Sequence, residues 1–315
     1  MEDISKVLFE KLKEVCDSCN SDVISLSGGL DSTILGYYLK EKKPKAIVVI
    51  AKDFPSTDLT YSQLAAKELD LSLNIVKVST EEILESIKAT IAILRNFNDI
   101  EIRNNIVMYL AIKWVKDQGL QGIVTGDGAD ELFAGYRFLI KKEEHEIEQE
   151  IQRIGSIMHF PTQQIGKAMG IKVESPFLDK KIIEFANYVP TNLKVKTEND
   201  KKYGKWILRK TFENKIPFQI AWREKSPMQD GAGTKGLSSL FDTMISDEIF
   251  SEKKKIIEKE SNITIRSKES LHYFEIYKKM YGLSDNTKNT EISCPYCHFT
   301  TENSKFCRMC GAFPI

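Results

Sequence analysis

The stretch Val23-Ile24-Ser25-Leu26-Ser27-Gly28-Gly29-Leu30-Asp31-Ser32 decides the fold of this chain. Its apolar, β-branched beginning is typical of a buried strand, and the polar residues that follow Leu30 favour the start of a helix. The two adjacent glycines allow backbone conformations that bring successive N–H groups close to a ligand. Such N–H groups and the helix dipole together favour phosphate oxygens. The stretch therefore predicts a strand, a phosphate-binding turn and a helix.

The residues of the turn indicate which phosphate ligand it binds. No lysine follows the glycines, so the Gly-Lys-Ser/Thr loop that grips β- and γ-phosphates is absent from this stretch. Asp31 would repel phosphate unless a divalent cation lay between them. We therefore interpret the turn as a site for a magnesium nucleotide, with an ordinary strand-to-helix turn as the alternative.

The composition is typical of a globular protein with one sizeable core. The chain has 315 residues, of which 42% are hydrophobic and 29% charged, and its 45 basic residues balance its 45 acidic ones. This balance gives no bulk electrostatic case for binding nucleic acid or an anionic membrane. The acidic start Met1-Glu2-Asp3 does not resemble a signal peptide, and no apolar run reaches the ~18 residues that span a bilayer. We expect a cytoplasmic protein.

Predicted strands alternate with predicted helices along the chain. Strands are expected at Lys45 to Ile50, Asn74 to Val78 and Gly122 to Thr125. This alternation favours a parallel, doubly wound α/β sheet covered on both faces. Ligands of such sheets bind at the carboxyl ends of the strands, where the strand order reverses. The loops after Leu26 and Thr125 should therefore face one crevice. Ser79-Thr80-Glu81-Glu82 predicts a capping box for a helix that runs towards Leu94. A long charged helix is expected over Arg137 to Phe160.

The loop that follows the strand at Gly122 reads Thr125-Gly126-Asp127-Gly128-Ala129-Asp130-Glu131-Leu132-Phe133-Ala134-Gly135-Tyr136. Its three closely spaced acids destabilise one another unless a cation or a proton intervenes. A metal site is the economical interpretation. The alternative is a solvated acidic turn in which Asp127 or Asp130 caps the next helix.

These motifs resemble a known family. The first loop is similar to the SGGxDS loop of N-type ATP pyrophosphatases, and the second resembles the SGEGSDExFGGY segment of asparagine synthetases. Four later segments are similar to that family's VPFLDK, KxxLR, WRxKxxxxDGxG and SKExxxYRxIF motifs: Val173–Lys180, Tyr203–Lys210, Ala221–Gly233 and Ser267–Tyr277. The resemblance implies an adenine nucleotide alpha hydrolase-like sheet with a helical second layer. It also implies an AMP-forming ligase that adenylates the side-chain carboxylate of aspartate and transfers it to ammonia, giving asparagine.

The resemblance also implies site residues. ATP would be bound by Leu26, Ser27, Gly28, Gly29, Asp31, Ser32, Ile50, Thr125 and Gly126. Magnesium would be held by Asp31 and Asp130. Lys225 would neutralise charge that develops between the α- and β-phosphates. Asp127 stands where the family has Glu and would handle the ammonia proton. Arg103 would lie near the amino-acid substrate, with a surface arginine as the alternative.

The C-terminal cysteines predict a structural zinc ribbon. Cys294 and Cys297 form one Cys-x-x-Cys pair, and Cys307 and Cys310 form a second pair nine residues later. Four thiolates satisfy tetrahedral zinc, which would supply most of the folding free energy of so short a tail. Disulfides or a redox pair are the alternatives. We expect a synthetase-like domain over 1–283, a linker over 284–290 and the ribbon over 291–315. The third pair, Cys16 and Cys19, is expected to contain packing thiols.

Three functions remain open at this point. Asparagine synthetases of this type usually begin with a glutaminase domain, and Glu2 stands where its catalytic cysteine would be. We therefore expect free ammonia, a partner glutaminase or another amine as the nitrogen source, and the ribbon suggests a macromolecular partner. One alternative is an enzyme that adenylates a tRNA base, with the ribbon contacting tRNA. The other is a non-catalytic nucleotide-binding regulator, against which the joint presence of Asp31, Asp130 and Lys225 argues.

Overall fold

The computed structural model describes the chain except residues 1, 225–227, 284–292 and 302–304. The chain divides into two compact units. The first comprises Met1–Ile50, Thr57–Val76 and Ala111–Pro227, and the second comprises Ala51–Ser56, Lys77–Leu110 and Met228–Ile315. The expected domain boundary at residue 283 stays a prediction, and the expected linker over 284–290 lies outside the described residues.

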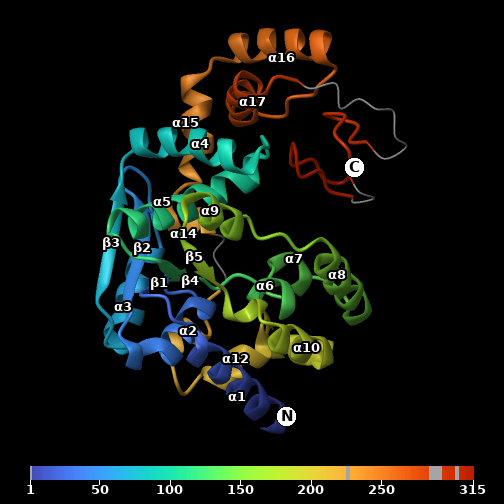
Figure 1. Cartoon of the computed structure of the whole chain (residues 1–315). Coiled ribbons are helices and arrows are strands. Elements are labelled where there is room, and N and C mark those ends of the chain that lie inside the picture. Colours follow the sequence, from blue (N-terminus) through green and yellow to red (C-terminus); the bar gives the residue numbers. More distant parts are fainter. Residues whose placement is uncertain (1, 225–227, 284–292, 302–304) are drawn as a thin grey trace. The chain divides into compact units, whose positions relative to one another are not determined.

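A five-stranded sheet has the order β3-β2-β1-β4-β5 (Figure 1). Its strands are β1 (Val23–Ser25), β2 (Lys45–Ala51), β3 (Leu73–Val78), β4 (Gly122–Val124) and β5 (Lys172–Glu174). The pairs β1–β2, β1–β4 and β4–β5 are parallel, with Val23 opposite both Lys45 and Ile123. The chain builds outward from β1 to β3 and then returns to the other side of β1 with β4. This confirms the predicted doubly wound sheet and places its switch point between β1 and β4.

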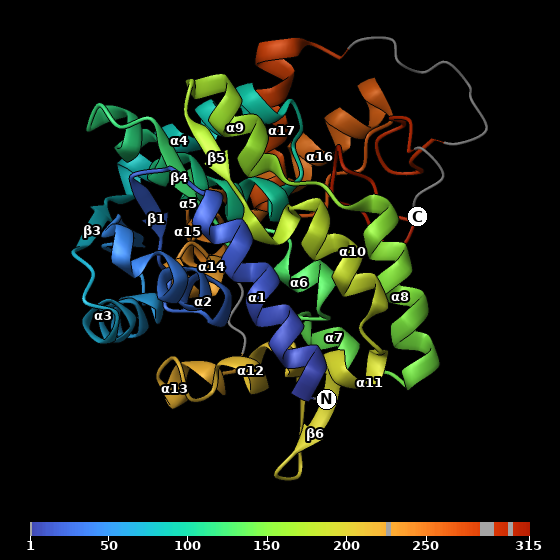
Figure 2. The ribbon, with the colours of Figure 1, turned by 60° about the horizontal axis from the view of Figure 1, so that its bottom comes forward.

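The first unit also contains helices. They are α1 (Glu2–Ser18), α2 (Leu30–Leu39), α3 (Asp58–Glu68), α6 (Ala129–Leu132), α7 (Arg137–Ile140), α8 (Glu144–Ile157), α9 (Pro161–Met169), α10 (Lys180–Tyr188), α11 (Thr191–Lys194), α12 (Trp206–Phe212) and α13 (Phe218–Ala221), with 3-10 turns η1 (Lys40–Lys42) and η2 (Pro176–Leu178). Figure 2 shows α1 passing beside α2 and α12. The apolar faces of α1, α2, α10 and α12 form one core with the buried side chains of β1 and β4.

The N-terminal cysteines lie inside this core. Cys16 and Cys19 are both buried, and neither forms a disulfide. Burial raises the pKa of both thiols, that of Cys19 to about 11. Thiols held in the protonated form are poor metal ligands, because the thiolate is the species that binds metal. Their surroundings agree with the expectation of packing thiols.

The second unit is mostly helical. Its helices are α4 (Thr80–Leu94), α14 (Met228–Ala232), α15 (Gly236–Met244), α16 (Asp247–Ser261) and α17 (Lys268–Tyr281), and α5 (Asp99–Asp117) contributes residues to both units. Ser79 begins α4 with the predicted capping box, in which its side chain and that of Glu82 cap each other's backbone N–H groups. Tyr273, Phe274 and Tyr277 of α17 are buried and belong to the core.

Two local features differ from the sequence-based expectations. The prediction of a single helix over Arg137 to Phe160 is wrong, because the chain forms α7 and α8 with a break at residues 141–143. α7 ends at Ile140, and Glu143 begins α8 as its N-cap through a capping box with Glu146. The expected helical layer also contains an antiparallel hairpin of β6 (Val195–Glu198) and β7 (Lys201–Gly204).

Within the described part of the chain, no helix combines the length and the apolar character needed to cross a bilayer.

Gly28 is the residue of the first loop whose replacement should be least tolerated. Its φ is +69°, and a Cβ built there would lie 2.1 Å from the backbone carbon of Tyr61. Gly28→Ala should therefore lower the free energy of unfolding by about 2–4 kcal/mol, as strain at a special backbone position does. Gly29→Ala is the matched control, because a Cβ there meets nothing closer than 3.3 Å. Urea unfolding of both variants measures the difference between their free energies of unfolding. Equal values would contradict the special requirement for glycine at position 28.

Candidate active site

The loop after β1 presents the start of α2 to the carboxyl end of the sheet. Gly29 is the N-cap of α2, and no side chain caps this helix start. The Ser27 hydroxyl instead accepts a hydrogen bond from the Gly29 N–H at 3.3 Å, and the Ser32 hydroxyl donates to the Gly29 carbonyl at 3.2 Å. The first N–H groups of α2 are therefore available to an anion.

Arg223 holds this loop from the side. Its guanidinium lies 3.8 Å from the ring centroid of Tyr61 and donates to the Gly28 carbonyl at 3.2 Å. It also donates to Asp58, 3.4 Å away, at the start of α3. Burial raises the pKa of Asp58 to about 6, and Arg223 opposes this effect. Sequence reasoning quoted Arg223 within the WRxK segment without giving it this contact, which joins segments 195 residues apart.

The loop after β4 meets the loop after β1, as the predicted switch point requires. A Cβ built on Gly126 would lie 3.2 Å from the Cβ of Asp31. Thr125, 2% exposed, follows β4 and donates its hydroxyl proton to Asp127 at 2.9 Å. Ile50 lies in β2, immediately before the last residue of that strand, and is 5% exposed. The ATP-binding roles of these residues stay predictions.

The acids of the two loops converge on one lysine. The Lys205 Nζ lies 2.6 Å from Asp31 Oδ2 and 2.6 Å from Asp130 Oδ1. Lys205 is 4% exposed. Burial alone would lower its pKa, but the charges of Asp130 and Asp31 and their hydrogen bonds raise it above the ordinary value. The cation that the acidic loop requires is therefore a lysine ammonium in the free protein.

The backbone around Lys205 is arranged for this contact. Lys205 follows the β6–β7 hairpin with a φ of +54°, and its N–H donates to the Phe133 carbonyl at 3.0 Å. A Cβ on Gly135 would lie 1.8 Å from Asp130 Oδ1, and one on Gly204 would lie 2.2 Å from the Ala134 carbonyl oxygen. Sequence reasoning missed Lys205, although the KxxLR resemblance was a signal for it.

Asp127 lies near Asp130, and its pKa is raised. Burial raises the pKa of Asp127 to about 6. The Thr125 hydrogen bond opposes this effect, and the charges of Glu131 and Asp130 add to it. The N-cap of α6 is Gly128, with no side-chain cap. The alternative in which Asp127 or Asp130 caps the next helix is therefore wrong.

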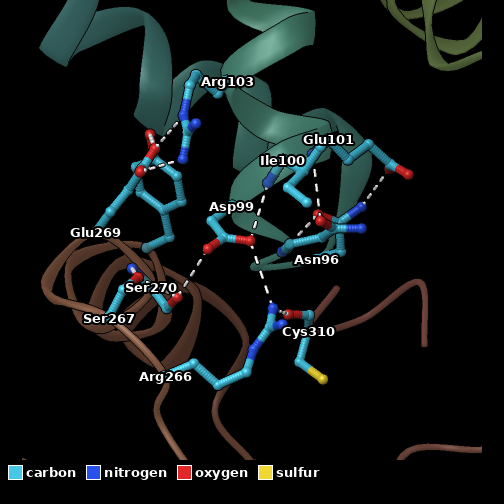
Figure 3. Close-up of polar contacts among 12 residues, drawn as sticks. Asn96, Asp99, Ile100, Glu101, Arg103, Arg266, Ser267, Glu269, Ser270 and Cys310 are labelled. Atoms are coloured by element: carbon cyan, nitrogen blue, oxygen red, sulfur yellow. Dashed lines mark hydrogen bonds and ion pairs between the residues drawn. The ribbon is translucent and has the colours of Figure 1, made fainter. Parts of the chain in front are cut away.

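The other two predicted catalytic residues are placed differently. Lys225 lies outside the described residues. Arg103 lies on α5 within the second unit, where Nε donates to Glu269 Oε1 at 2.9 Å and Nη2 pairs with Glu269 Oε2 (Figure 3). Its side chain is 13% exposed, so the alternative of a surface arginine is wrong. Tyr273 donates to the same carboxylate at 2.8 Å. The role of Arg103 toward an amino acid stays a prediction.

The four C-terminal cysteines form a second candidate site. Cys294, Cys297, Cys307 and Cys310 are buried free thiols whose sulfur atoms all lie within 4.8 Å of one another. The sulfurs of Cys294 and Cys310 are 3.7 Å apart, and those of Cys297 and Cys307 are 3.5 Å apart. Tetrahedral zinc with Zn–S bonds of about 2.3 Å needs sulfurs about 3.8 Å apart. These separations are too long for disulfide bonds and fit a zinc site with four cysteine ligands.

This cysteine cluster packs against other residues of the second unit, to which it belongs. The N–H of Phe97 donates to the Met309 carbonyl at 2.9 Å, and the Asn98 side chain donates to the Arg308 carbonyl at 3.3 Å. Figure 3 shows Arg266 between the Cys310 carbonyl and Asp99, to which it donates. The sulfur cluster is thereby joined to the first turn of α5.

The comparison with protein families identifies the chain. The asparagine synthase family matches residues 21–163 and 141–270. The chain belongs to the asparagine synthase family. Its relatives include asparagine synthetase B [glutamine-hydrolyzing] of Escherichia coli K12, 27% identical over 281 residues, a match that covers 82% of this chain and 50% of that enzyme. The asparagine synthetase [glutamine-hydrolyzing] of Gallus gallus is 28% identical over 276 residues, covering 81% and 48%. The chain thus spans about half the length of these relatives.

Among solved structures, NMN synthetase from Francisella tularensis aligns with a TM-score of 0.40 and 12% identity, covering 89% of this chain and 93% of that one.

Removing metal from the cysteine cluster should destabilise the second unit. The purified protein is expected to hold one zinc ion per chain, and chelation or Cys307→Ser should lower the melting temperature, because metal binding supplies folding free energy. Cys16→Ala is the matched control, since it removes a buried thiol of the first unit and should leave the zinc content unchanged. Elemental analysis combined with thermal unfolding measures both quantities. A metal-free native protein would contradict the site.

The raised pKa of Asp127 should appear in the pH dependence of stability. The folded protein holds this proton up to a pH of about 6, whereas the unfolded chain releases it near the ordinary value of 3.8. The contribution of Asp127 to stability therefore falls as the pH rises between these values. Asp127→Asn should raise the free energy of unfolding by about 2–3 kcal/mol at pH 7 and by little near pH 4. Denaturant unfolding at both pH values measures this effect. An equal gain in the free energy of unfolding at pH 4 and pH 7 would contradict the raised pKa of Asp127.

Proposed function

We propose that this chain catalyses AMP-forming amide synthesis, with aspartate as the acid and ammonia as the nitrogen donor. The aspartate side-chain carboxylate attacks the α-phosphorus of ATP, forming the acyl-adenylate and releasing pyrophosphate. Ammonia then attacks the acyl carbon, AMP leaves with the bonding electron pair, and asparagine is released. The observation that carries the proposal is the convergence of Asp31 and Asp130, from the two loops at the switch point, on one buried cation.

The acid pair also fits a magnesium ion. Asp31 Oδ1 is buried without a hydrogen-bond partner among the described residues, while Asp31 Oδ2 faces Lys205. Carboxylate oxygens are preferred magnesium ligands, and magnesium typically takes one or two of them together with substrate phosphates. Asp31 and Asp130 would hold the ion, which when bound supplies positive charge to the triphosphate.

The remaining loop residues divide the chemical tasks. The uncapped start of α2 offers N–H groups to phosphate, and Arg223 keeps the Gly28 turn in place for that purpose. Asp127, with a pKa of about 6, is ionised at neutral pH and suited to accept the proton that ammonia loses when it attacks. Lys225 keeps the role that the family resemblance implies, which is to neutralise charge on the leaving pyrophosphate.

Ammonia as the nitrogen donor is part of the proposal and needs its own test. The curated relatives carry the words glutamine-hydrolyzing in their names, and the chain matches about half of their length. Ammonium and glutamine are therefore both supplied in the assay. The ribbon packs against α5 and the segment before α17 through backbone carbonyls, which gives it a partner within this chain.

The test is pyrophosphate release and product mass with magnesium and ATP. Pyrophosphate should be released with aspartate, and asparagine and AMP should form when ammonium is added. Asp130→Asn should abolish both activities. Asp127→Asn should retain aspartate-dependent exchange of pyrophosphate into ATP while losing about 10²–10⁴-fold in asparagine formation, the size of a general-base contribution. Lys43→Met, which removes an exposed ion pair to Asp70, is the control and should behave as the wild type.

Other outcomes would identify the alternatives. Pyrophosphate release that requires tRNA and ignores aspartate would replace this proposal with adenylation of a tRNA base. Nucleotide binding without pyrophosphate release for every acid and amine supplied would indicate a regulator.

A further inference from the structure

Lys205 is an ammonium buried between two carboxylates at the place where a metal is expected. Burying such a group costs free energy unless it is paired, and here each acid lies 2.6 Å from its nitrogen. Its side chain is 5% exposed, and those of Asp31 and Asp130 are 20% and 21% exposed. The two acids together carry two negative charges, of which the lysine neutralises one.

Lys205 is held along its length, by its backbone at one end and by the two acids at the other. The backbone is held by the hydrogen bond from its N–H to the Phe133 carbonyl and by the close approach of Gly204 to Ala134. The side chain passes Gly135, where a Cβ would lie 2.2 Å from the lysine Cε. The backbone of Lys205 is therefore fixed. The ammonium can move away from the acid pair only by rotation about the side-chain bonds of Lys205.

The charges decide what happens when a divalent cation arrives. A cation that binds to Asp31 and Asp130 would lie beside the lysine ammonium, and like charges at contact distance in a partly buried site repel strongly. The ammonium occupies Asp31 Oδ2 and Asp130 Oδ1, so a cation that bridges the two acids through these oxygens has to displace it, and a cation on Asp31 Oδ1 would still lie beside it. Moving the ammonium away from the acids costs free energy unless another anion binds it. The phosphates of a nucleotide are such anions.

We propose that Lys205 is a resident counter-cation that keeps divalent metal off the Asp31–Asp130 pair until a polyphosphate draws its ammonium away. Metal and nucleotide then enter together, and the acid pair is never left without a positive partner. The part that concerns nucleotide rests on the proposed function. The exclusion of metal from the free protein follows from the lysine contacts alone.

The experiment measures Mn²⁺ binding to the zinc-loaded protein without nucleotide, by electron paramagnetic resonance titration and by the shift in melting temperature. Lys205→Met keeps most of the side-chain volume and removes the charge. Lys205→Gln also removes the charge and keeps an N–H donor. Both variants should bind Mn²⁺ about tenfold or more tightly than the wild type, and Mn²⁺ should raise the melting temperature of these two variants only.

Lys194→Met is the matched control. Lys194 is also a lysine of the first unit that is 4% exposed, and the charge that acts on it comes from Glu148 instead of the acid pair. This variant should bind Mn²⁺ as weakly as the wild type. A general effect of removing a buried lysine would change both sites alike, whereas metal exclusion is specific to Lys205.

Two results would overturn the proposal. One is Mn²⁺ binding by either folded Lys205 variant that is no tighter than that of the wild type. The other is micromolar Mn²⁺ binding by the free wild-type protein, which decides the matter even if both variants fail to fold. Failure of the proposed function looks different, because asparagine would then not form from aspartate, ammonium and magnesium ATP, while the comparison of Mn²⁺ binding by the free proteins would still hold.

Discussion

The first unit depends on one constraint, which is that two carboxylates from different strand ends must share a cation. Asp31 belongs to the first turn of α2, Asp130 to α6, and Lys205 to the residue after the β6–β7 hairpin. Three segments that are far apart in the chain therefore meet at one nitrogen atom. The glycines at 135 and 204 are required there because a side chain would occupy space already taken by the acid, the lysine and a backbone carbonyl.

The second unit is organised around a different interaction. Asp99, at the start of α5, accepts hydrogen bonds from Arg266 and Ser270, and Arg266 also donates to the carbonyl of Cys310. Next to Ser270, Glu269 pairs with Arg103 on α5. The cysteine cluster, the start of α5 and the start of α17 are thus linked by one polar network. The tail that holds the four cysteines is thereby hydrogen-bonded to the segments that precede α5 and α17.

Local sequence patterns predicted the parts of the structure that local forces determine. The strand before Gly28, the capping box at Ser79 and the two Cys-x-x-Cys pairs depend on residues a few positions apart, and each was expected from the sequence. The break at residues 141–143 was missed because the capping residue Glu143 lies in a run of charged residues that also suits a continuous helix. The hairpin before Lys205 was missed because its short polar strands carry little apolar alternation.

The sequence by itself determined the local elements and predicted that two glycine-bordered acidic loops face one crevice, with a cation or a proton beside the acids of the second loop because like charges repel at short range. Only the tertiary structure decided that this cation is Lys205 in the free protein, because the pairing depends on a contact across 174 residues. The same holds for Arg103: its charge is evident in the sequence, but its partner Glu269 is 166 residues away. Ion pairs follow the path of the backbone in space, which no spacing of residues along the chain specifies.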